Sequence, residues 1–568
     1  MTEQSYYQEI IPIILEKKPN KESLVNLKTS LCKKHGVKQI PTDIQILMNT
    51  PKEYTEQIKP ILLTKPTRSI SGVSVVAVMS APRMCPHGRC IYCPGGPNSK
   101  LGNVPQSYTG KEPSTLRAIR NNYDPYLITM NRLEQYVVTG HAFDKIEVII
   151  QGGTFPSYDK EYKDDFVRGI FKALNDFGEM FFEKEGKEEF DLIKFKEFFE
   201  LPHDVKDDER TKRIQEKLLK KKNENSSGVE QEIKKNETGK IRCIGLTMET
   251  RSDYGKAKSG NDMLRLGCTR VELGIQSVYE DVIEFIGRKH TVQDNIDSIR
   301  DLRDLGFKIN MHYMPGLPKT TRQQDLEGLK QLFTDPNYKP DMLKVYPCMV
   351  FEGTPLYAMM KLGEFTPLST EQAADLIAEF KKYVPKYCRI MRVNRDIPSY
   401  MASGGVDKTN LRQIIEKKCK EKNIHCNCIR CREIGRAEDL DKTEKPELTI
   451  AEYEASEGKE FFIAYETKRH ILGFARLRFP SRSLRDEITP TTALIRELHV
   501  YGQAIEIGKD PLDKTQHKGI GKLLMAKAEE IAKQNKKHKM VVISGVGVRE
   551  YYKKLGYQND GPYVSKIL

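Results

Sequence analysis

The sequence predicts an α/β protein: a partial (β/α) barrel and a second α/β domain, with a helical N-terminal segment and a metal-binding linker. Three observations predict this architecture. Strand-like apolar runs alternate with helical stretches from residue 73 to 365, as in parallel βα units. The order of strands and helices then changes after residue 437. Six of the 12 cysteines form two short clusters, which in a reducing compartment indicate metal sites rather than disulfides.

Length and charge limit the class of protein. A chain of 568 residues suggests three or four structural units. The net charge of +14 favours a polyanionic partner, although solvated lysines alone can produce it. No apolar run approaches the roughly 18 residues of a membrane span, and the N-terminus does not resemble a secretory signal. We therefore expect a cytoplasmic protein without a membrane partner, with a nuclear pool left open.

The chain divides into four parts along this pattern. Residues 1–72 read as a basic helical segment, and residues 73–365 as the barrel, interrupted by a charged, solvated and partly helical or disordered insertion at 183–240. Residues 366–436 read as a linker with the second cysteine cluster, and residues 437–568 as the second α/β domain. The predicted barrel strands are Val73–Met79, Lys145–Ile150, Ile241–Met248, Arg270–Ile275, Phe307–Tyr313 and Met342–Tyr346.

The first cysteine cluster follows the first predicted strand and comprises Cys85, Cys90 and Cys93. Three thiolates on a four-iron cube leave one iron open to a small molecule, as in enzymes that bind S-adenosylmethionine. The spacing C-x4-C-x2-C differs from the C-x3-C-x2-C that is commonest in radical-SAM enzymes, and a zinc site is the structural alternative. Gly152 and Gly153 follow the next strand, where backbone can approach a ligand closely, and they favour the radical-SAM interpretation.

A glycine-rich turn precedes an amphipathic helix near the C-terminus. Gln516, Gly519 and Gly521 match the pattern Q/R-x-x-G-x-G/A with which GNAT-type acetyltransferases bind the coenzyme A pyrophosphate. Backbone N–H groups and the helix dipole favour an anion at such a helix start. An ordinary glycine-rich turn is the alternative for a match taken alone.

The segments around this turn strengthen the interpretation. The strand Arg496–Gly502 lies upstream and can offer its edge to the pantetheine amides. Downstream, after a further strand, come Tyr551 and Tyr552. We expect one tyrosine to pack in the core and the other to point its hydroxyl at the thioester. This order of strand, turn, helix, strand and tyrosine-bearing helix is typical of GNAT domains.

The second cysteine cluster comprises Cys426, Cys428 and Cys431 and supplies three soft ligands. Tetrahedral zinc needs a fourth ligand, and the sequence does not choose one. We predict a structural zinc in the linker rather than a second redox cluster. The candidates for the fourth ligand are Cys419, His425, Cys388 and Cys348.

Several longer stretches occur in one order along the chain, and together they resemble the catalytic subunit of Elongator with its archaeal and bacterial single-chain relatives. A departure is Ser252, where the family usually has proline. The matching stretches are CPHGRCIYCPGGP, QSYTGKEPSTLRAIR, YDPY, QGGTFPS, CIGLTMETRSD, GCTRVELGIQSVYEDV, HYMPGLP, RDIPS, RELHVYG, QHKGIGKLLM and SGVGVREYYKKLGY.

The resemblance implies a radical-SAM barrel and a GNAT domain, with particular site residues. Cys85, Cys90 and Cys93 would hold a 4Fe-4S cluster, and the two glycines would lie against S-adenosylmethionine. Lys145 belongs to the barrel, so its predicted contact with acetyl-CoA means that the two domains share a substrate. Acetyl-CoA would be contacted by Lys145, Glu497, Leu498, His499, Val500, Ile520, Gly521, Lys522 and Tyr552, with Lys145, Glu497, Tyr551 and Tyr552 in catalytic roles.

The resemblance also implies a reaction: acetyl-CoA and radical-SAM chemistry together place a carboxymethyl group on carbon 5 of the wobble uridine of tRNA. Basic residues of the N-terminal segment, with Arg117 and Arg120, would hold the anticodon arm. Elongator-type subunits or a second copy of the chain are the expected protein partners. The alternatives are a protein lysine (histone) acetyltransferase with a structural metal cluster, a non-catalytic scaffold, and a radical-SAM methylthiolation.

Overall fold

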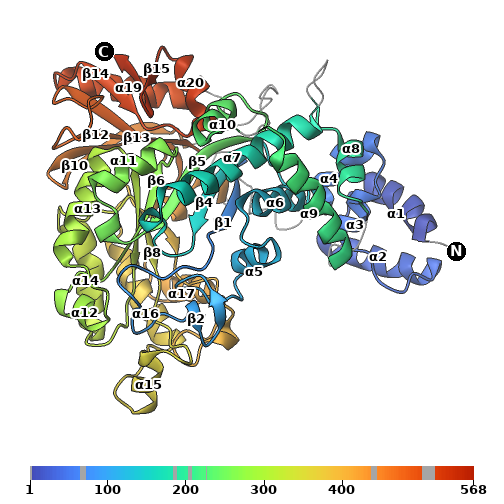
Figure 1. The fold of residues 1–568 in the computed structure, drawn as a ribbon, viewed down its shortest axis with the longest axis horizontal. Helices are drawn as coiled ribbons and strands as arrows, with labels where there is room; N and C mark the ends of the chain where they lie inside the picture. The colour runs from blue at the N-terminus through green and yellow to red at the C-terminus, as the bar shows by residue number, and fades with distance from the viewer. Residues whose placement is uncertain are drawn as a thin grey trace.

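The computed structural model describes residues 3–63, 72–182, 189–202, 207–225, 227–436, 444–501 and 519–568. Figure 1 shows the N-terminal helices at one end of the molecule, the barrel in the middle and the C-terminal sheet domain beside it. None of the helices in this part of the chain has both the length and the apolar character that a bilayer crossing requires.

The N-terminal segment forms four helices, as the sequence predicts. Their apolar side chains, Tyr6, Ile10 and Ile14 among them, belong to the same buried core as the barrel helices. Lys196 of the insertion donates to the carbonyl of Met48, which links the N-terminal segment to the insertion. The helices are α1 (Glu3–Lys17), α2 (Lys21–His35), α3 (Asp43–Met48) and α4 (Lys52–Leu62).

The barrel is a seven-stranded, all-parallel open sheet with the strand order β1-β4-β5-β6-β7-β8-β9. The six predicted strands are present, with ends that differ by one or two residues. The seventh strand was not predicted. The strands are β1 (Ser74–Met79), β4 (Lys145–Gln151), β5 (Arg242–Thr250), β6 (Arg270–Gln276), β7 (Lys308–Tyr313), β8 (Met342–Val345) and β9 (Arg389–Arg392).

Strand β9 lies within the predicted linker, 366–436, so part of that stretch belongs to the barrel sheet. It pairs in parallel with β8, from Met342 opposite Arg389 to Lys344 opposite Arg392. Its sequence, Arg-Ile-Met-Arg, is short and carries two charges, so its composition does not signal a strand. Pairing with β8 therefore decides its structure.

Helices cover the outer face of this sheet, and a small hairpin of β2 (Gly96–Ser99) and β3 (Gly102–Val104) follows the first cysteine cluster. The helices α5 to α7 lie between β1 and β5, and the rest follow later strands. They are α5 (Pro113–Arg120), α6 (Pro125–Val138), α7 (Lys160–Phe181), α11 (Ala257–Arg265), α12 (Glu280–Phe285), α13 (Val292–Asp304), α14 (Arg322–Thr334), α15 (Pro355–Lys361), α16 (Thr370–Phe380), α17 (Leu411–Glu421) and α18 (Ile429–Arg432).

The charged insertion is more ordered than its composition indicates. It forms α8 (Leu192–Phe198), α9 (Asp208–Asn223) and α10 (Val229–Asn236), as the partly helical prediction allows. Phe195 and Phe199, however, are fully buried against the aromatic side chains of α7. The expectation of a solvated segment is therefore wrong at these positions, because a few phenylalanines in a polar stretch are enough to dock it.

The C-terminal domain is a second seven-stranded sheet, ordered β10-β11-β12-β13-β14-β16-β15, with β13 and β14 parallel and the other pairs antiparallel. One face packs on α19 and the other joins the barrel core. Its elements are β10 (Glu447–Ala455), β11 (Gly458–Glu466), β12 (Ile471–Phe479), β13 (Thr492–Val500), α19 (Ile520–Gln534), β14 (Lys539–Val542), the 3-10 turn η8 (Val546–Val548), α20 (Arg549–Lys553), β15 (Gln558–Asp560) and β16 (Tyr563–Ile567).

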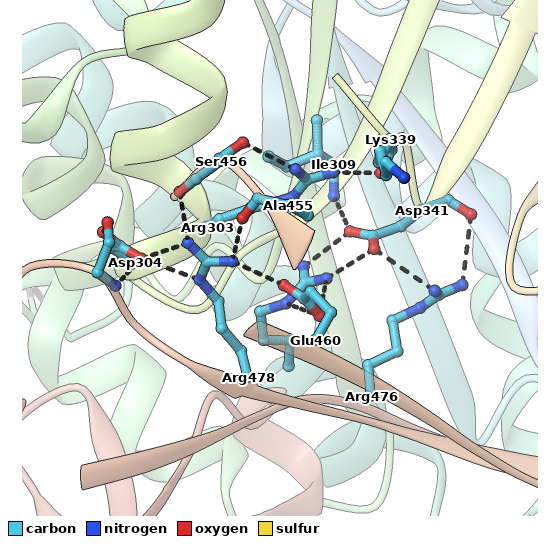
Figure 2. A network of polar contacts seen from close by, with 12 residues as sticks. Arg303, Asp304, Ile309, Lys339, Asp341, Ala455, Ser456, Glu460, Arg476 and Arg478 are labelled. Carbon is cyan, nitrogen blue, oxygen red and sulfur yellow. Dashed lines mark hydrogen bonds and ion pairs between the residues drawn. The ribbon is translucent and has the colours of Figure 1, made fainter. Parts of the chain in front are cut away.

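A buried network of arginines and acids joins the two domains (Figure 2). Arg496 of β13 pairs with Asp341 at 2.7 Å, and Arg478 of β12 pairs with Asp304 at 2.6 Å, all four side chains being fully buried. Asp341 precedes β8 and Asp304 ends α13, before β7. The C-terminal domain therefore covers the N-terminal ends of the barrel strands. Removing one partner of such a buried pair typically costs about 3–5 kcal/mol, so this interface is sensitive to the loss of any one of these charges.

Candidate functional site

The first cysteine cluster lies in the loop that follows β1, at the C-terminal ends of the barrel strands. Cys90 and Cys93 are buried and Cys85 is half-buried. Polar groups surround the sulfur atoms: the His87 imidazole Nε2 is 3.2 Å from Cys90 Sγ, and the Gln106 amide donates to Cys93 Sγ over 3.2 Å. Thiolates with such neighbours suit a metal cluster, because hydrogen bonds to sulfur stabilise its negative charge.

The two predicted glycines close around the same loop. Gly152 has φ +124° and a Cβ there would lie 2.1 Å from Ser80 Oγ, so a side chain is excluded. Gly153 has φ +105° and a Cβ would lie 3.7 Å from Cys85 Sγ. Both positions follow β4 and lie in the left-handed region, which favours glycine. The turn therefore brings its backbone up to the cysteine loop, and its contact with S-adenosylmethionine stays a prediction.

A cavity of about 320 Å³ begins at Cys85 and Gly153 and continues into the barrel. Its charged lining was missed by sequence reasoning, although the signal was present as polar residues at alternate positions of β6 and β7. The inner side chains of these strands include Arg270, Glu272, Gln276 and His312.

Glu272 is the centre of this lining and is 1% exposed. It accepts from Asn310 over 3.2 Å, lies 3.0 Å from His312 Nε2 and forms an ion pair with Lys344. Burial opposes its ionisation, yet Lys344 and His312 hold the pKa of this carboxyl well below its usual range. Burial lowers the pKa of His312 to about 4, so the imidazole is neutral at neutral pH.

The predicted coenzyme A site lies where strands β13 and β14 part. Their pairing runs from Thr492 opposite Lys539 to Ile495 opposite Val542, and β13 continues beyond it to Val500. The last residues of β13 therefore run on without β14 beside them, which is the strand geometry that pairing with the amides of a pantetheine arm requires. Leu498 and Val500 face the α19 core, as their contacts show.

Glu497 and His499 lie on the other face of β13, toward the barrel. Arg476 donates to Glu497 over 2.8 Å. Burial opposes ionisation of Glu497, but Lys308 of β7 and Arg476 hold its pKa below the usual range. The imidazole of His499 stacks on Phe474, and burial lowers its pKa.

The start of α19 carries the predicted phosphate turn. Gly519 is its N-cap with φ +78°, and Ile520, Gly521 and Lys522 form its first turn. Ile520 is buried, so its backbone N–H is the group that it can offer to a phosphate. Gln516 lies outside the described residues.

The two adjacent tyrosines lie in different surroundings, and their contacts with acetyl-CoA stay predictions. Tyr552 is 6% exposed and packs in the core beneath α19. The Tyr551 hydroxyl lies over Gly521, where a Cβ would approach it to 2.6 Å. The hydroxyl that reaches the helix start therefore belongs to Tyr551, and Tyr552 is the packed residue.

Lys145 is the first residue of β4 and is paired in register with Arg242 of β5. A Cβ on Gly547 of the C-terminal domain would lie 2.4 Å from the Cβ of Arg242. The barrel end that holds Lys145 is thus in direct contact with the C-terminal domain, which is what a lysine shared between the two sites requires.

The second cysteine cluster is a tight group between α17 and the C-terminal sheet. The sulfur atoms of Cys426, Cys428 and Cys431 all lie within 4.8 Å of one another. A tetrahedral zinc with Zn–S bonds of about 2.3 Å needs sulfur atoms about 4 Å apart, so the donor set fits one ion. Among the described residues, none of the four candidate fourth ligands belongs to this group.

These observations define a class of protein: a radical-SAM barrel whose base is covered by an acetyltransferase domain. Comparisons with protein families agree. The chain matches the ELP3 N-terminal domain over residues 4–70, the radical SAM superfamily over 79–329, the Radical_SAM C-terminal domain over 340–421 and the acetyltransferase (GNAT) family over 430–557. A radical-SAM domain implies a 4Fe-4S cluster and S-adenosylmethionine, and a GNAT domain implies acetyl-CoA.

The relatives identify the family. The chain is 42% identical to a tRNA uridine(34) acetyltransferase of Methanocaldococcus jannaschii, over 93% of this chain and 90% of the relative. It is 38% identical to Elongator complex protein 3 of Saccharomyces cerevisiae, over 96% and 92%. The solved structure of archaeal Methanocaldococcus infernus Elp3 with an N-terminal deletion matches with a TM-score of 0.70 and 37% identity, over 88% of this chain and 100% of that one. The protein belongs to this Elongator protein 3 family of acyltransferases.

Proposed function

We propose that this protein places a carboxymethyl group, derived from acetyl-CoA, on carbon 5 of the wobble uridine of tRNA. One observation carries the proposal: a cysteine loop suited to an iron–sulfur cluster and a parted strand pair, β13 and β14, suited to acetyl-CoA lie at opposite ends of one barrel. Carbon 5 of uridine is not a nucleophile at neutral pH, so an acyltransferase site alone cannot modify it. The relatives' name, tRNA uridine(34) acetyltransferase, supports this substrate.

In this proposal the residues of the chain bind and orient the reactants. Cys85, Cys90 and Cys93 hold the cluster, and the Gly152–Gly153 turn receives S-adenosylmethionine against its backbone. The cluster and S-adenosylmethionine together supply an adenosyl radical that can take a hydrogen atom from a methyl group. The parted edge of β13 and the start of α19 hold acetyl-CoA, with the Tyr551 hydroxyl over the same turn.

The N-terminal helices and α5 form the proposed tRNA surface. Arg117 and Arg120 lie in the last turn of α5, whose Leu116 and Ile119 are also exposed, at 47% and 44%. Cations beside exposed apolar side chains suit a splayed single-stranded loop, in which phosphates and unstacked bases are both presented. Binding should weaken steeply with salt. We further propose that zinc binds at Cys426, Cys428 and Cys431. The chain also assembles with other subunits or with a second copy of itself.

The test is anaerobic incubation with tRNA, acetyl-CoA, S-adenosylmethionine and dithionite, followed by mass spectrometry of the nucleosides. We expect 5-carboxymethyluridine from the wild-type protein and none from Cys85→Ser. Protein shown to carry its cluster that yields no such product would contradict the proposal. The rival, protein lysine acetylation, needs only the coenzyme A site. Full acetylation of a protein substrate by Cys85→Ser, with no product on tRNA from the wild type, would establish that rival.

A further inference from the structure

The helix that carries the two adjacent tyrosines is too short to be stable by itself. α20 runs from Arg549 to Lys553, and isolated helices shorter than about 12–15 residues are marginal in water. Its place beside the start of α19 must therefore come from contacts with other parts of the chain. One of these contacts is with the charged insertion, whose helix α10 lies beside α20 in Figure 1.

A single carboxylate of the insertion pairs with both ends of α20. Glu237, which caps the C-terminus of α10, forms an ion pair with Arg549 at 2.7 Å and another with Lys553 at 3.2 Å. Glu237 is only 7% exposed, so water and salt screen these pairs less than they screen surface pairs. Arg549 also donates to the carbonyl of Pro562, and Lys553 also pairs with Glu550. We call Glu237 with its two cations the clamp.

The clamp and the Tyr551 hydroxyl lie on opposite faces of α20. Residues four apart in a helix share a face, whereas residues two apart are separated by about 200° around its axis. Tyr551 therefore points away from Glu237 and toward Gly521, where an added Cβ would lie 2.6 Å from its hydroxyl. Because both cations meet one carboxylate, the clamp fixes the rotation of α20 and with it the place of this hydroxyl.

Glu237 is itself held by a well-anchored part of the barrel. The residue before it, Asn236, is fully buried. The Asn236 amide donates to the carbonyl of Ile241 over 2.9 Å and to the side-chain oxygen of Asn175 in α7 over 2.8 Å. The Asn236 side-chain oxygen accepts from the backbone N–H of Cys243 in β5 over 2.8 Å. The carboxylate of the clamp is therefore placed by β5 and α7.

The turn that precedes α20 is packed closely on the same strand. A Cβ on Gly545 would lie 2.0 Å from the carbonyl oxygen of Ile244, and one on Gly547 would lie 2.4 Å from the Cβ of Arg242. Backbone thus contacts backbone, and this contact fixes where α20 begins. It leaves the rotation of the helix open, which is the freedom that Glu237 removes.

We propose that Glu237 is a positioning residue for the acetyl-CoA site, which gives the charged insertion a part in coenzyme binding. The inference rests on the proposed function, in which the start of α19 and the tyrosines of α20 hold acetyl-CoA. The ligand meets correctly placed tyrosines only when the insertion is docked on α20. An element of the barrel thereby completes a site that lies in the acetyltransferase domain.

The first test compares two affinities on the full chain with its cluster. The probes are desulfo-coenzyme A, which has no thiol to acylate, and S-adenosylmethionine, both measured by calorimetry. Glu237→Ala should bind desulfo-coenzyme A about 10-fold more weakly, because a site that is no longer pre-organised loses affinity. Its affinity for S-adenosylmethionine should stay within about twofold of the wild type. An unchanged affinity for desulfo-coenzyme A would overturn the inference, and so would equal losses for both ligands, which indicate a general loss of structure.

Glu200→Gln is the matched control for the clamp. Glu200 is a carboxylate of the same insertion that also pairs with two cations, Arg213 at 2.8 Å and Lys217 at 2.9 Å, but both of these belong to the insertion. Glu200→Gln should bind desulfo-coenzyme A as the wild type does, whereas Glu237→Gln should bind it several-fold more weakly. Equal affinities in these two variants would contradict a special role of Glu237.

The second test follows the tyrosine by ¹⁹F NMR, with 3-fluorotyrosine incorporated only at position 551. The wild-type resonance should differ from that of the free amino acid and should move when desulfo-coenzyme A is added. In Glu237→Ala it should move toward the free amino acid and respond little to the ligand. Lys553→Met keeps the pair with Arg549, so its resonance should lie between the two, and this variant decides if Glu237→Ala does not fold. A wild-type resonance in the folded variants would overturn the inference.

The two proposals fail differently. Wild-type protein that carries its cluster and yields no 5-carboxymethyluridine ends the proposed function, whatever the fluorotyrosine resonance shows. Product formation by the wild type, together with unchanged binding of desulfo-coenzyme A in Glu237→Ala, ends this inference alone.

Discussion

The two cysteine triads share a C-x2-C pair but form different sites. Cys90 and Cys93, with Cys85, lie in a loop over a cavity. Among the described residues, their sulfur atoms do not form a tight group of the kind that binds a single metal ion. The sulfur atoms of Cys428 and Cys431, with Cys426, fall within 4.8 Å of one another. Spacing along the chain therefore predicts ligands, and the backbone around them decides how many metal atoms fit.

Both triads lie beside a cation, and they differ in what else surrounds the sulfur atoms. The first triad faces glycine backbone, the Gln106 amide and the buried Arg288 guanidinium, which lies 3.9 Å from Cys90 Sγ. The second lies beside the Lys381 ammonium, whose pKa the nearby thiols raise although burial opposes it. A site beside a cavity can bind a small molecule, whereas a single-ion site in the linker between two folded parts can serve stability.

The largest expected effect comes from the first triad. Cys90→Ser should lower formation of the modified uridine at least ~10³-fold, because the cluster loses one of three ligands. The melting temperature should change by less than about 3 °C, since serine is close to cysteine in size and Cys90 packs in a small cluster separate from the main barrel core. Iron content, nucleoside mass spectrometry and calorimetry measure this. Cys32→Ala, at a buried cysteine of α2, is the control and should keep its iron. Strong destabilisation by Cys90→Ser would break the comparison.

For the second triad we expect a loss of stability without a loss of iron. Cys428→Ser should remove the bound metal and lower the free energy of unfolding by several kcal/mol, because metal binding contributes to folding. Its iron content at the first triad should stay unchanged. Metal analysis and chemical denaturation measure both quantities. A chelator strong enough to remove zinc should lower the melting temperature of the wild type and leave that of Cys428→Ser where it is.

A smaller effect tests the glycine backbone beside the first triad. Gly153→Ala places a Cβ 3.4 Å from Gln106 Cβ and 3.7 Å from Cys85 Sγ, in the left-handed region. We expect S-adenosylmethionine to bind about 10-fold more weakly, which corresponds to about 1.4 kcal/mol. Gly102→Ala, also at positive φ but with nothing within 4 Å, is the matched control and should bind normally. Equal losses in both variants would show that strain alone is responsible.

The smallest effect concerns the sulfur hydrogen bonds. Gln106→Leu removes the amide that donates to Cys93 Sγ over 3.2 Å. The reduction potential of the cluster should become more negative by on the order of tens of mV, because hydrogen bonds to sulfur stabilise the reduced state. Spectroelectrochemistry of the air-free protein measures it. The second triad, which we propose binds redox-inert zinc, should show no potential at all, and a reversible couple there would contradict the distinction.

Much of the site could be predicted from the sequence, because its signals are local. The cysteine loop, the Gly152–Gly153 turn and the start of α19 each need only a strand or helix and a few neighbouring residues. The polar cavity inside the barrel escaped prediction. Glu272 and His312 look like ordinary strand residues, and only the register of β6 with β7 shows that they face one channel. The short strand β9 was missed for the same reason.

The sequence by itself determined which residues can bind metal, phosphate or thioester, and the alternation of strands and helices that positions them, since short-range periodicity and turn chemistry specify both. The tertiary structure alone decided that the acetyltransferase domain covers the base of the barrel. That placement depends on contacts between residues more than a hundred positions apart, such as Arg496 with Asp341. Such contacts follow from packing, and no local pattern encodes them.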